Sequence, residues 1–377
     1  MYLKKLNKNF LLATFSNCFF FVNFSCFFLL PLFLDNLGYT KTLIGLTMSS
    51  FGISSILLTP FCSSLIDRYG KKLLSLIALF LMIISSLSFI YFDNFFVIIC
   101  LRIIQGAAFS IFFNASSAIA SNNLDDEDKQ YGLSFFSSFT IFSYFLGPFF
   151  SEKLITSHGF EEFFVYSSIF SVLAFLLIMN LDESPSASKV QIKVSSFFKI
   201  IRDEKIFDIL FANFLVASGF GVVMNFVSLY LVGKGLSVGY FFAGYAIVVS
   251  LSRIFLSSYI RQSNLFPKVL LMLLLFSLTI FFIPAINSLI GVMAFSILFP
   301  ATYSLIYPIL SSILMIGRDH SISGRLFGAL NASFSIGVNL MTLFYGLIAD
   351  LYSFESMFRF ASLLIIAGVV LILIQRR

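Results

Sequence analysis

The chain has 377 residues, of which 59% are hydrophobic and only 11% are charged. Soluble globular domains carry about 25% charged residues, so this composition excludes an ordinary water-soluble protein and indicates one that resides in a bilayer. The net charge of +6 does not indicate nucleic-acid binding, because the Lys and Arg residues lie in short segments between apolar runs.

The apolar runs predict twelve transmembrane helices, since each run is close to the roughly 20 residues that cross a bilayer. The first run is too long for the apolar region of a signal peptide and is predicted to be a span. We therefore expect an all-α polytopic membrane protein. In chain order the predicted spans are 10–34, 43–64, 73–92, 95–120, 132–154, 161–181, 206–232, 238–260, 267–286, 288–315, 325–349 and 355–374.

The Lys and Arg residues predict the orientation of these spans. If the N-terminus is inside, most of the 24 Lys and Arg residues fall on the cytoplasmic face. Positive residues favour that face, so both termini are predicted to be cytoplasmic, in a cell inner membrane. The expected partners are the lipid bilayer and a small-molecule substrate, and the protein is expected to be a monomer.

The only long polar interruption is the segment 182–205, where Pro185 and several serines indicate a linker. It divides the predicted spans six and six. Shifting the second half by 194 residues aligns matching residues from the second span to the twelfth. These include Gly45 with Gly239, Ala107 with Ala301, and Phe160–Phe164 with Phe354–Phe358.

We therefore predict an N-terminal bundle of six helices at 1–181, a cytoplasmic linker at 182–205 and a C-terminal bundle of six helices at 206–377. Two homologous bundles with the same orientation form the parallel type of repeat found in transporters.

The stretch Ser63–Lys72 is a highly charged interval between two apolar runs, and it is predicted to be a cytoplasmic loop. Gly70 permits a tight backbone turn there. Asp67 could accept hydrogen bonds from the N-terminus of a neighbouring helix or pair with Arg68. The alternative is an ordinary solvated loop.

This stretch resembles the loop between the second and third helices of major facilitator superfamily transporters, with the pattern G-x-x-x-D-R-x-G-R/K-R/K. Ser63 replaces the first glycine, and the rest of the pattern is present. The resemblance implies two bundles that work by alternating access, in the drug- and sugar-efflux branch of proton antiporters. It also implies that this loop holds the two bundles together in the outward-open state. The implied gating residues are Asp67, Arg68, Gly70, Lys71 and Lys72.

Arg102 lies inside the fourth predicted span, about 10 Å from its outer end. A charge at this depth costs about 2.5–3.5 kcal/mol on insertion scales and should face a cavity or a partner. The segment Leu101–Gly106 resembles the R-x-x-Q-G pattern of the same superfamily, which implies a role in proton coupling or in holding a carboxylate. Asp35 and Glu152 are the candidate carboxylates, and protonation would change their pairing with Arg102. A purely structural ion pair is the alternative.

The fifth span contains Gly147 and Pro148, which resemble the antiporter signature G-x-x-x-G-P-x-x-G. Ser143 and Ser151 replace the first and last glycines. Small residues allow close helix packing and Pro148 can kink the span, so Gly106, Gly147 and Pro148 are predicted packing positions. An ordinary proline kink is the alternative.

Polar residues inside the spans are candidates for lining a substrate cavity, although an interhelical hydrogen bond is the more common role for any one of the amides. Arg253 could attract an acidic substrate group or extend to the cytoplasmic surface. Tyr303 and Tyr307 are four residues apart, on one helical face, and could offer hydroxyls and rings or pack in the core. The full set is Asn17, Asn23, Gln105, Asn114, Asn225, Arg253, Tyr303, Tyr307, Asn331 and Asn339.

No catalytic motif, phosphate-binding loop or metal-ligand spacing is present in the sequence, so an enzyme is not expected. No cofactor is expected, and a proton gradient is the expected energy source. The predicted function is proton-coupled efflux of a small molecule. The alternatives are a proton-coupled importer or a uniporter of a metabolite, and a non-transporting receptor or assembly protein on the same scaffold.

Overall fold

The computed structural model describes residues 7–125, 128–182, 206–255, 265–316, 318 and 323–375. Throughout these ranges the regular structure is helical, and they contain no strand. Eleven helices there are long and apolar enough to cross a membrane, and the apolar helix Gly239–Ser252 is shorter. The all-α polytopic fold is confirmed. Residues 183–205 of the predicted linker lie outside the described residues.

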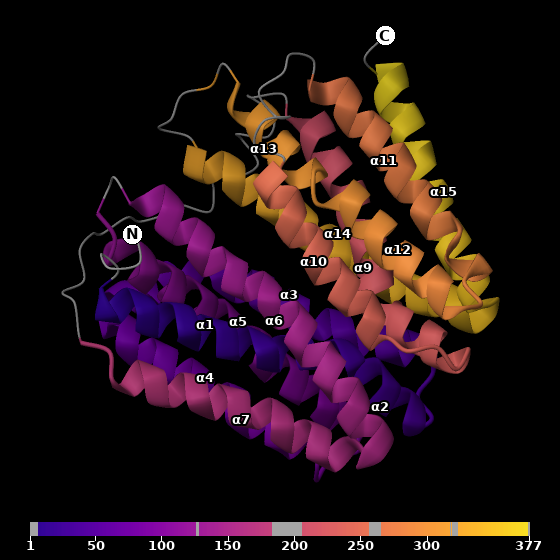
Figure 1. Ribbon diagram of the computed structural model, residues 1–377. Coiled ribbons are helices and arrows are strands. Elements are labelled where there is room, and N and C mark those ends of the chain that lie inside the picture. Colours follow the sequence, from indigo (N-terminus) through magenta and orange to yellow (C-terminus); the bar gives the residue numbers. More distant parts are fainter. Residues whose placement is uncertain are drawn as a thin grey trace. The chain divides into compact units, whose positions relative to one another are not determined.

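The first half of the chain forms the helices coloured indigo to magenta in Figure 1. The predicted first span contains a short 3₁₀ segment, η2, between two α-helices. The elements are α1 (Lys8–Cys26), η2 (Phe27–Leu29), α2 (Leu30–Asn36), α3 (Lys41–Tyr69), α4 (Lys71–Ser88), α5 (Phe95–Asn122), α6 (Lys129–Ser157) and α7 (Phe160–Met179).

The second half forms α9 (Phe207–Gly233), α10 (Gly239–Phe255), α11 (Leu265–Phe281), η5 (Ile283–Ala285), α12 (Leu289–Tyr303), α13 (Ile306–Met315), α14 (Ser323–Leu351) and α15 (Phe354–Gln375). Four of its helices start 194 positions after a helix of the first half. The pairs are α4 with α11, α5 with α12, α6 with α14, and α7 with α15. The described helix starts therefore follow the same offset as the sequence repeat.

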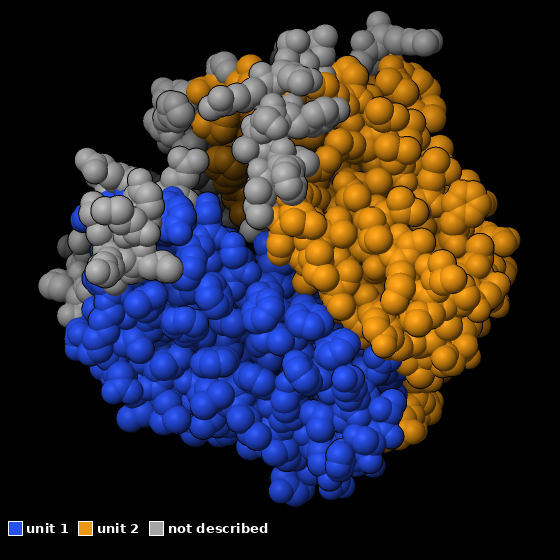
Figure 2. Space-filling model, viewed as in Figure 1, with its two compact units in different colours: residues 1–33, 50–192 blue, residues 34–49, 193–377 orange. Residues whose placement is uncertain are grey.

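The chain divides into two compact units, coloured separately in Figure 2. Unit 1 comprises residues 1–33 and 50–192, and unit 2 comprises residues 34–49 and 193–377. The helix α3 therefore contributes its first nine residues, 41–49, to unit 2 and the remainder to unit 1. In each unit the first long helix is the most deeply buried, α1 in unit 1 and α9 in unit 2. Both have buried side chains all around the helix, as a central helix requires, and polar ones among them bond neighbouring helices.

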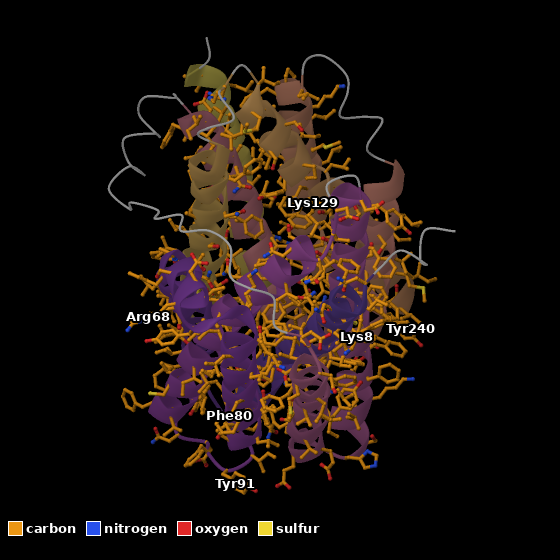
Figure 3. The ribbon with its side chains drawn as sticks, turned by 90° about the vertical axis from the view of Figure 1, so that its left-hand side faces the viewer. Lys8, Arg68, Phe80, Tyr91, Lys129 and Tyr240 are labelled. Carbon is orange, nitrogen blue, oxygen red and sulfur yellow. The ribbon has the colours of Figure 1, made fainter. Side chains whose placement is uncertain are left out.

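Phenylalanine serves both the interior and the surface. In the core of unit 1, Phe20 stacks on Phe112 with ring centroids 4.2 Å apart. On the outside, Phe80 and Tyr91 are 54% and 79% exposed. Both residues are labelled in Figure 3, with Tyr91 at the lower edge of the view. Phe80 lies on the outer face of α4 and suits contact with lipid, whereas Tyr91 lies in the turn between α4 and α5.

Two expectations about local structure were wrong. The stretch Ser63–Lys72 is not a loop, because α3 continues to Tyr69 and α4 begins at Lys71. Only Gly70 separates them, at φ 89°, and its N–H still donates to the carbonyl of Ile66 at 2.9 Å. A single residue with positive φ, usually glycine, is a common helix end, and the residues before Gly70 are all compatible with helix.

The tenth span, predicted to be continuous, is divided into α12 and α13. Pro308 in α13 has no N–H to donate to the carbonyl of Ser304, four residues earlier. The helix is accordingly interrupted at Ser304 and Leu305.

Candidate functional site

Arg102 lies in the interior of unit 1, with only 3% of its surface exposed. Its Nη1 donates to Gln105 Oε1 at 2.8 Å, one turn further along α5. The guanidinium carbon is 4.6 Å from the ring centroid of Phe51 and 5.8 Å from that of Phe27. Its Nε has no hydrogen-bond partner, and Arg102 forms no ion pair with any described residue. The guanidinium is therefore held by one amide and two aromatic rings.

A string of hydrogen bonds continues from this pair through four helices. Gln105 Nε2 on α5 donates to Ser86 Oγ on α4 at 3.3 Å. Asn23 Nδ2 on α1 donates to the same hydroxyl at 3.3 Å and to the carbonyl of Ser167 on α7 at 2.7 Å. Asn23 and Gln105 are fully buried, and Asn23 Oδ1 has no partner. Buried polar groups without partners are uncommon. Asn23 Oδ1 and Arg102 Nε are two such atoms at the ends of this string of hydrogen bonds.

Gly106 explains why an aromatic ring covers Arg102. A Cβ at Gly106 would overlap the backbone carbonyl of Phe51 on α3. Glycine therefore allows α3 and α5 to approach closely, and Ser54 Oγ donates across the same contact to the carbonyl of Ile103 at 2.7 Å. The predicted packing position thus places the Phe51 ring over the buried cation.

Gly147 acts in the same way between α6 and α1. A Cβ there would overlap Ser25 Oγ and approach the carbonyl of Val22. Ser25 Oγ also donates to the carbonyl of Ser143 at 2.8 Å. Pro148 lies within α6, which continues as one helix to Ser157.

The two predicted carboxylate partners of Arg102 lie elsewhere. Asp35 forms an ion pair with Lys41, and its side chain is 45% exposed. Glu152 is half-buried on α6, five residues before the end of that helix. Neither forms an ion pair with Arg102. The structure therefore does not bring the three proton-coupling candidates together.

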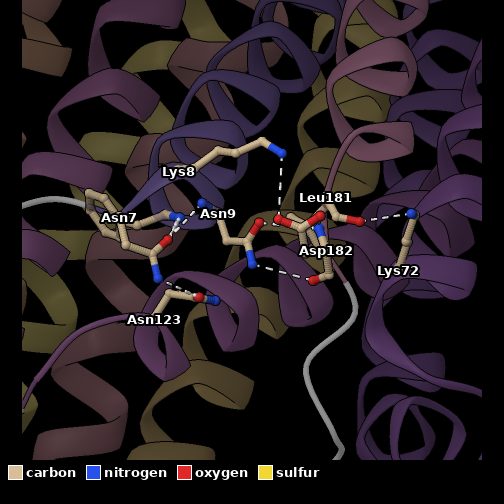
Figure 4. Close-up of polar contacts among 8 residues, drawn as sticks. Asn7, Lys8, Asn9, Lys72, Asn123, Leu181 and Asp182 are labelled. Carbon is tan, nitrogen blue, oxygen red and sulfur yellow. Dashed lines mark hydrogen bonds and ion pairs between the residues drawn. The ribbon is translucent and has the colours of Figure 1, made fainter.

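The residues of the charged motif divide into two groups. Asp67 and Arg68 are exposed, and the Arg68 guanidinium carbon lies 5.1 Å from the centroid of the Tyr69 ring. Figure 3 shows Arg68 and Tyr91 at opposite ends of unit 1. Lys72 Nζ, in contrast, donates to the carbonyl of Leu181, just after α7, at 2.7 Å (Figure 4). Lys71 Nζ lies against the side-chain amide of Asn122, the last residue of α5.

The same end of unit 1 carries further polar contacts (Figure 4). Lys8 Nζ and Asp182 Oδ2 form an ion pair at 3.4 Å, and the Asn9 side chain bonds both backbone groups of Asp182. Asn7 Nδ2 donates to Asn123 Oδ1 at 2.9 Å. Cations near helix C-termini are stabilising, so Lys71 and Lys72 help to hold the ends of α5 and α7.

The other amide candidates occupy two kinds of place. Asn17 is fully buried and donates to Thr140 Oγ1 on α6 at 2.8 Å, so it joins helices. The partly buried Asn114, Asn225 and Asn339 each donate to the carbonyl four residues earlier in their own helix, at 2.7–2.8 Å. Asn225 also donates to Thr342 Oγ1 on α14 at 3.0 Å, so it joins helices as Asn17 does. Arg253 lies in α10, but its side chain is outside the described residues.

In unit 2, Tyr303 and Tyr307 share one aromatic cluster despite the break between α12 and α13. Tyr303 stacks on Phe220 of α9 with ring centroids 4.8 Å apart. Phe334 of α14 contacts both Phe220 and Tyr307, at centroid distances of 5.8 and 6.4 Å. Tyr307 Oη donates to Oδ1 of the exposed Asn331 at 2.6 Å. Rings and an exposed amide are therefore adjacent, an arrangement that can contact an organic ring.

Sequence reasoning missed one polar site, formed by Asp350 near the end of α14 and the first residues of α3. The carboxylate accepts from the backbone N–H of Lys41 and of Thr42, both at 2.7 Å, and from Thr42 Oγ1 at 2.5 Å. All three residues belong to unit 2. The partners are about 300 positions apart in sequence, so no local pattern connects them.

Comparison with known proteins identifies the family. The family model for the Major Facilitator Superfamily matches residues 10–317. The staphylopine export protein of Staphylococcus aureus strain Mu50 is 24% identical over 366 residues, which cover 92% of this chain and 90% of that protein. The quinolone resistance protein NorA of Staphylococcus aureus is 28% identical over 163 residues, which cover 42% of this chain and 41% of that protein.

Solved structures show the same fold. A mutant of the nucleoside transporter NupG has a TM-score of 0.82 at 11% identity, covering 97% of this chain and 98% of that one. A POT family transporter in complex with 5-aminolevulinic acid has a TM-score of 0.81 at 12% identity, covering 98% and 96%. The predicted family is confirmed: the chain belongs to the Major Facilitator Superfamily, as a multi-pass membrane transporter of small molecules and not an enzyme.

Proposed function

We propose that the protein exports a small organic molecule across the cell inner membrane in exchange for protons. The observation that carries this proposal is the similarity to the staphylopine export protein, which extends over 92% of the chain. The partial match to a quinolone resistance protein supports the same direction of transport.

In this proposal the two six-helix bundles, 1–181 and 206–377, work by alternating access around a substrate bound between them. Both termini are cytoplasmic, and the transporter acts as a monomer. Asp67 and Arg68 are both exposed near the end of α3, whereas Lys71 contacts Asn122 and Lys72 bonds the carbonyl of Leu181. They are therefore the part of the motif that we assign to holding the bundles together in the outward-open state.

The proton gradient is the proposed energy source, because the sequence has no phosphate-binding loop for a nucleotide. Glu152 is the proposed proton carrier in unit 1, since it is half-buried within a helix, whereas Asp35 is held by Lys41 near the surface. Arg102 supplies a fixed positive charge in a low-dielectric interior, where it favours an anion in its surroundings.

The proposed substrate is a compound with an aromatic or other planar ring and hydrogen-bonding groups. The support is the cluster of Tyr303, Tyr307 and Phe334 beside the exposed amide of Asn331. Ring faces offer apolar area and can also hold a cation. Staphylopine and a quinolone are the first probes to test, because they appear in the names of the two relatives.

Transport in inside-out membrane vesicles with an acidic lumen tests this function. An exporter accumulates the probe in the lumen and releases luminal protons, which a pH-sensitive dye reports. Accumulation that persists unchanged after a protonophore indicates a uniporter. Uptake confined to right-side-out vesicles indicates an importer. Binding of a probe without movement in either orientation indicates a receptor.

A further inference from the structure

The Asp350 carboxylate closes the N-terminus of α3 like an N-cap supplied by another helix. The first N–H groups of a helix have no partner within the helix and carry its positive dipole end. Asp350 Oδ1 accepts from Lys41 N and Oδ2 accepts from Thr42 N, so both carboxylate oxygens are used. Thr42 Oγ1 adds a third hydrogen bond to Oδ2. This is a strong arrangement, because an ionised acceptor faces aligned donors.

Two glycines bring α3 and α14 together below this cap. A Cβ at Gly45 would lie 2.8 Å from the carbonyl oxygen of Thr342, and a Cβ at Gly346 would overlap the carbonyl of Lys41. One turn further, Ser49 Oγ donates to the carbonyl of Asn339 at 2.6 Å. The first part of α3 therefore contacts α14 closely from residue 41 to residue 49. We call this the α3–α14 contact.

The rest of α3 packs in unit 1, where Gly106 of α5 lies against the backbone of Phe51 and Ser54 bonds the carbonyl of Ile103. A single helix thus has one close contact in each unit. The contact in unit 1 places Phe51 over the buried Arg102, so opening it would uncover a buried charge. The carboxylate of the α3–α14 contact belongs to an exposed residue, so water can take over its hydrogen bonds when the helices part. The hydrogen bonds made by Asp350 at the start of the α3–α14 contact are therefore suited to reversible opening.

We propose that Asp350 is a gate residue, whose hydrogen bonds to Lys41 and Thr42 stabilise the closed state of the pathway at that end of α3. The proposal rests on alternating access in the proposed function. Asp67 lies near the opposite end of α3, is exposed, and forms no ion pair with a described residue. Opening the α3–α14 contact would release Asp350 while the end that carries Asp67 closes. The two carboxylates then act in alternate halves of the cycle.

The test is the reactivity of one buried position on the α3–α14 contact. Ser49 is 1% exposed, so a Ser49→Cys variant with the four native cysteines removed should react slowly with a water-soluble maleimide. The full-length protein in lipid nanodiscs exposes both faces to the reagent. Asp350→Ala should raise the labelling rate about 2- to 30-fold, the range that loss of a helix N-cap produces.

Thr42→Val removes only the side-chain donor and should raise the rate less, in the same direction. Glu161→Gln removes an exposed carboxylate from the first turn of α7 and is the matched control, with no expected change. A melting curve for each variant identifies any that fails to fold, and Thr42→Val then carries the test. The proposal would be overturned if folded Asp350→Ala and Thr42→Val were labelled at the same rate as the Ser49→Cys protein that carries neither substitution.

Flux measurements keep the two proposals apart. Proton-coupled export together with unchanged labelling rejects the gate and leaves the function standing. If Asp350→Ala is labelled faster and the wild-type protein exports no probe, the gate is supported and the proposed function is rejected.

Discussion

Arg102 donates a 2.8 Å hydrogen bond to Gln105, and this pair lies in the interior of unit 1 without a described carboxylate partner. A buried cation without an anion is destabilising, because the low-dielectric interior does not replace the lost hydration. Such a group therefore lowers the free energy of unfolding. We propose that Arg102 acts in transport.

The first prediction is that Arg102→Met combined with Gln105→Leu abolishes flux without lowering stability. Changing both residues removes the Arg102–Gln105 pair together, and Ser86 keeps its hydrogen bond from Asn23 when that from Gln105 is lost. The free energy of unfolding should be unchanged or higher by up to about 4 kcal/mol, as when buried charged groups are replaced by apolar ones of similar volume. Thermal unfolding and vesicle flux measure the two effects. A destabilised double variant that still transports would contradict this role of Arg102.

The second prediction concerns Gly106, which permits the close contact between α3 and α5. Gly106→Ala should lower the free energy of unfolding by about 1–3 kcal/mol, because the new Cβ overlaps the backbone of Phe51. Gly328→Ala is the matched control, since nothing lies within 4 Å of a Cβ there. It should raise the free energy of unfolding by about 0.5–1 kcal/mol. Equal melting temperatures for the two variants would show that the close contact is unimportant.

The third prediction separates the roles within the charged motif. Lys72→Met should lower the free energy of unfolding by about 1 kcal/mol, because Lys72 bonds the carbonyl of Leu181 beside the C-terminus of α7. Asp67→Asn should leave stability within about 0.5 kcal/mol, since the side chain is exposed, and should reduce flux strongly. Thermal unfolding and vesicle flux on both variants check the division. The reverse pattern would show that Asp67 is structural.

Much of this architecture could be predicted from the sequence. The spans follow from the lengths of the apolar runs. The segments Asp67–Lys72 and Arg102–Gly106 indicate the family, because their residue types and spacing match the superfamily patterns. The helix starts even preserve the offset of 194 residues that relates the two halves.

Contacts between distant residues could not be predicted. Asp350 and Thr42 form a hydrogen-bonded pair only because α3 and α14 are adjacent in space. The partners of Arg102 are rings and an amide, whereas charge alone indicates a carboxylate. The break at Gly70 and the one at Ser304–Leu305, caused by Pro308, each depend on a single residue, and span length does not detect such breaks.

The fourth prediction concerns the proton. Glu152→Gln should abolish uptake driven by a pH gradient in inside-out vesicles but leave exchange of labelled for unlabelled probe, because exchange needs no net proton movement. Asp35→Asn should retain at least about half of the driven uptake, since Asp35 is paired with Lys41 near the surface and not with Arg102. If both variants keep driven uptake, neither carboxylate carries the proton.

The most direct measurement of the central claim is proton release from acid-loaded inside-out vesicles when a probe is added. We expect staphylopine or a quinolone to cause release with the wild-type protein, and no release with Arg102→Met/Gln105→Leu or after a protonophore. Accumulation of the probe at the same rate with and without the pH gradient, or equal proton release by the Arg102 variant, would contradict proton-coupled export.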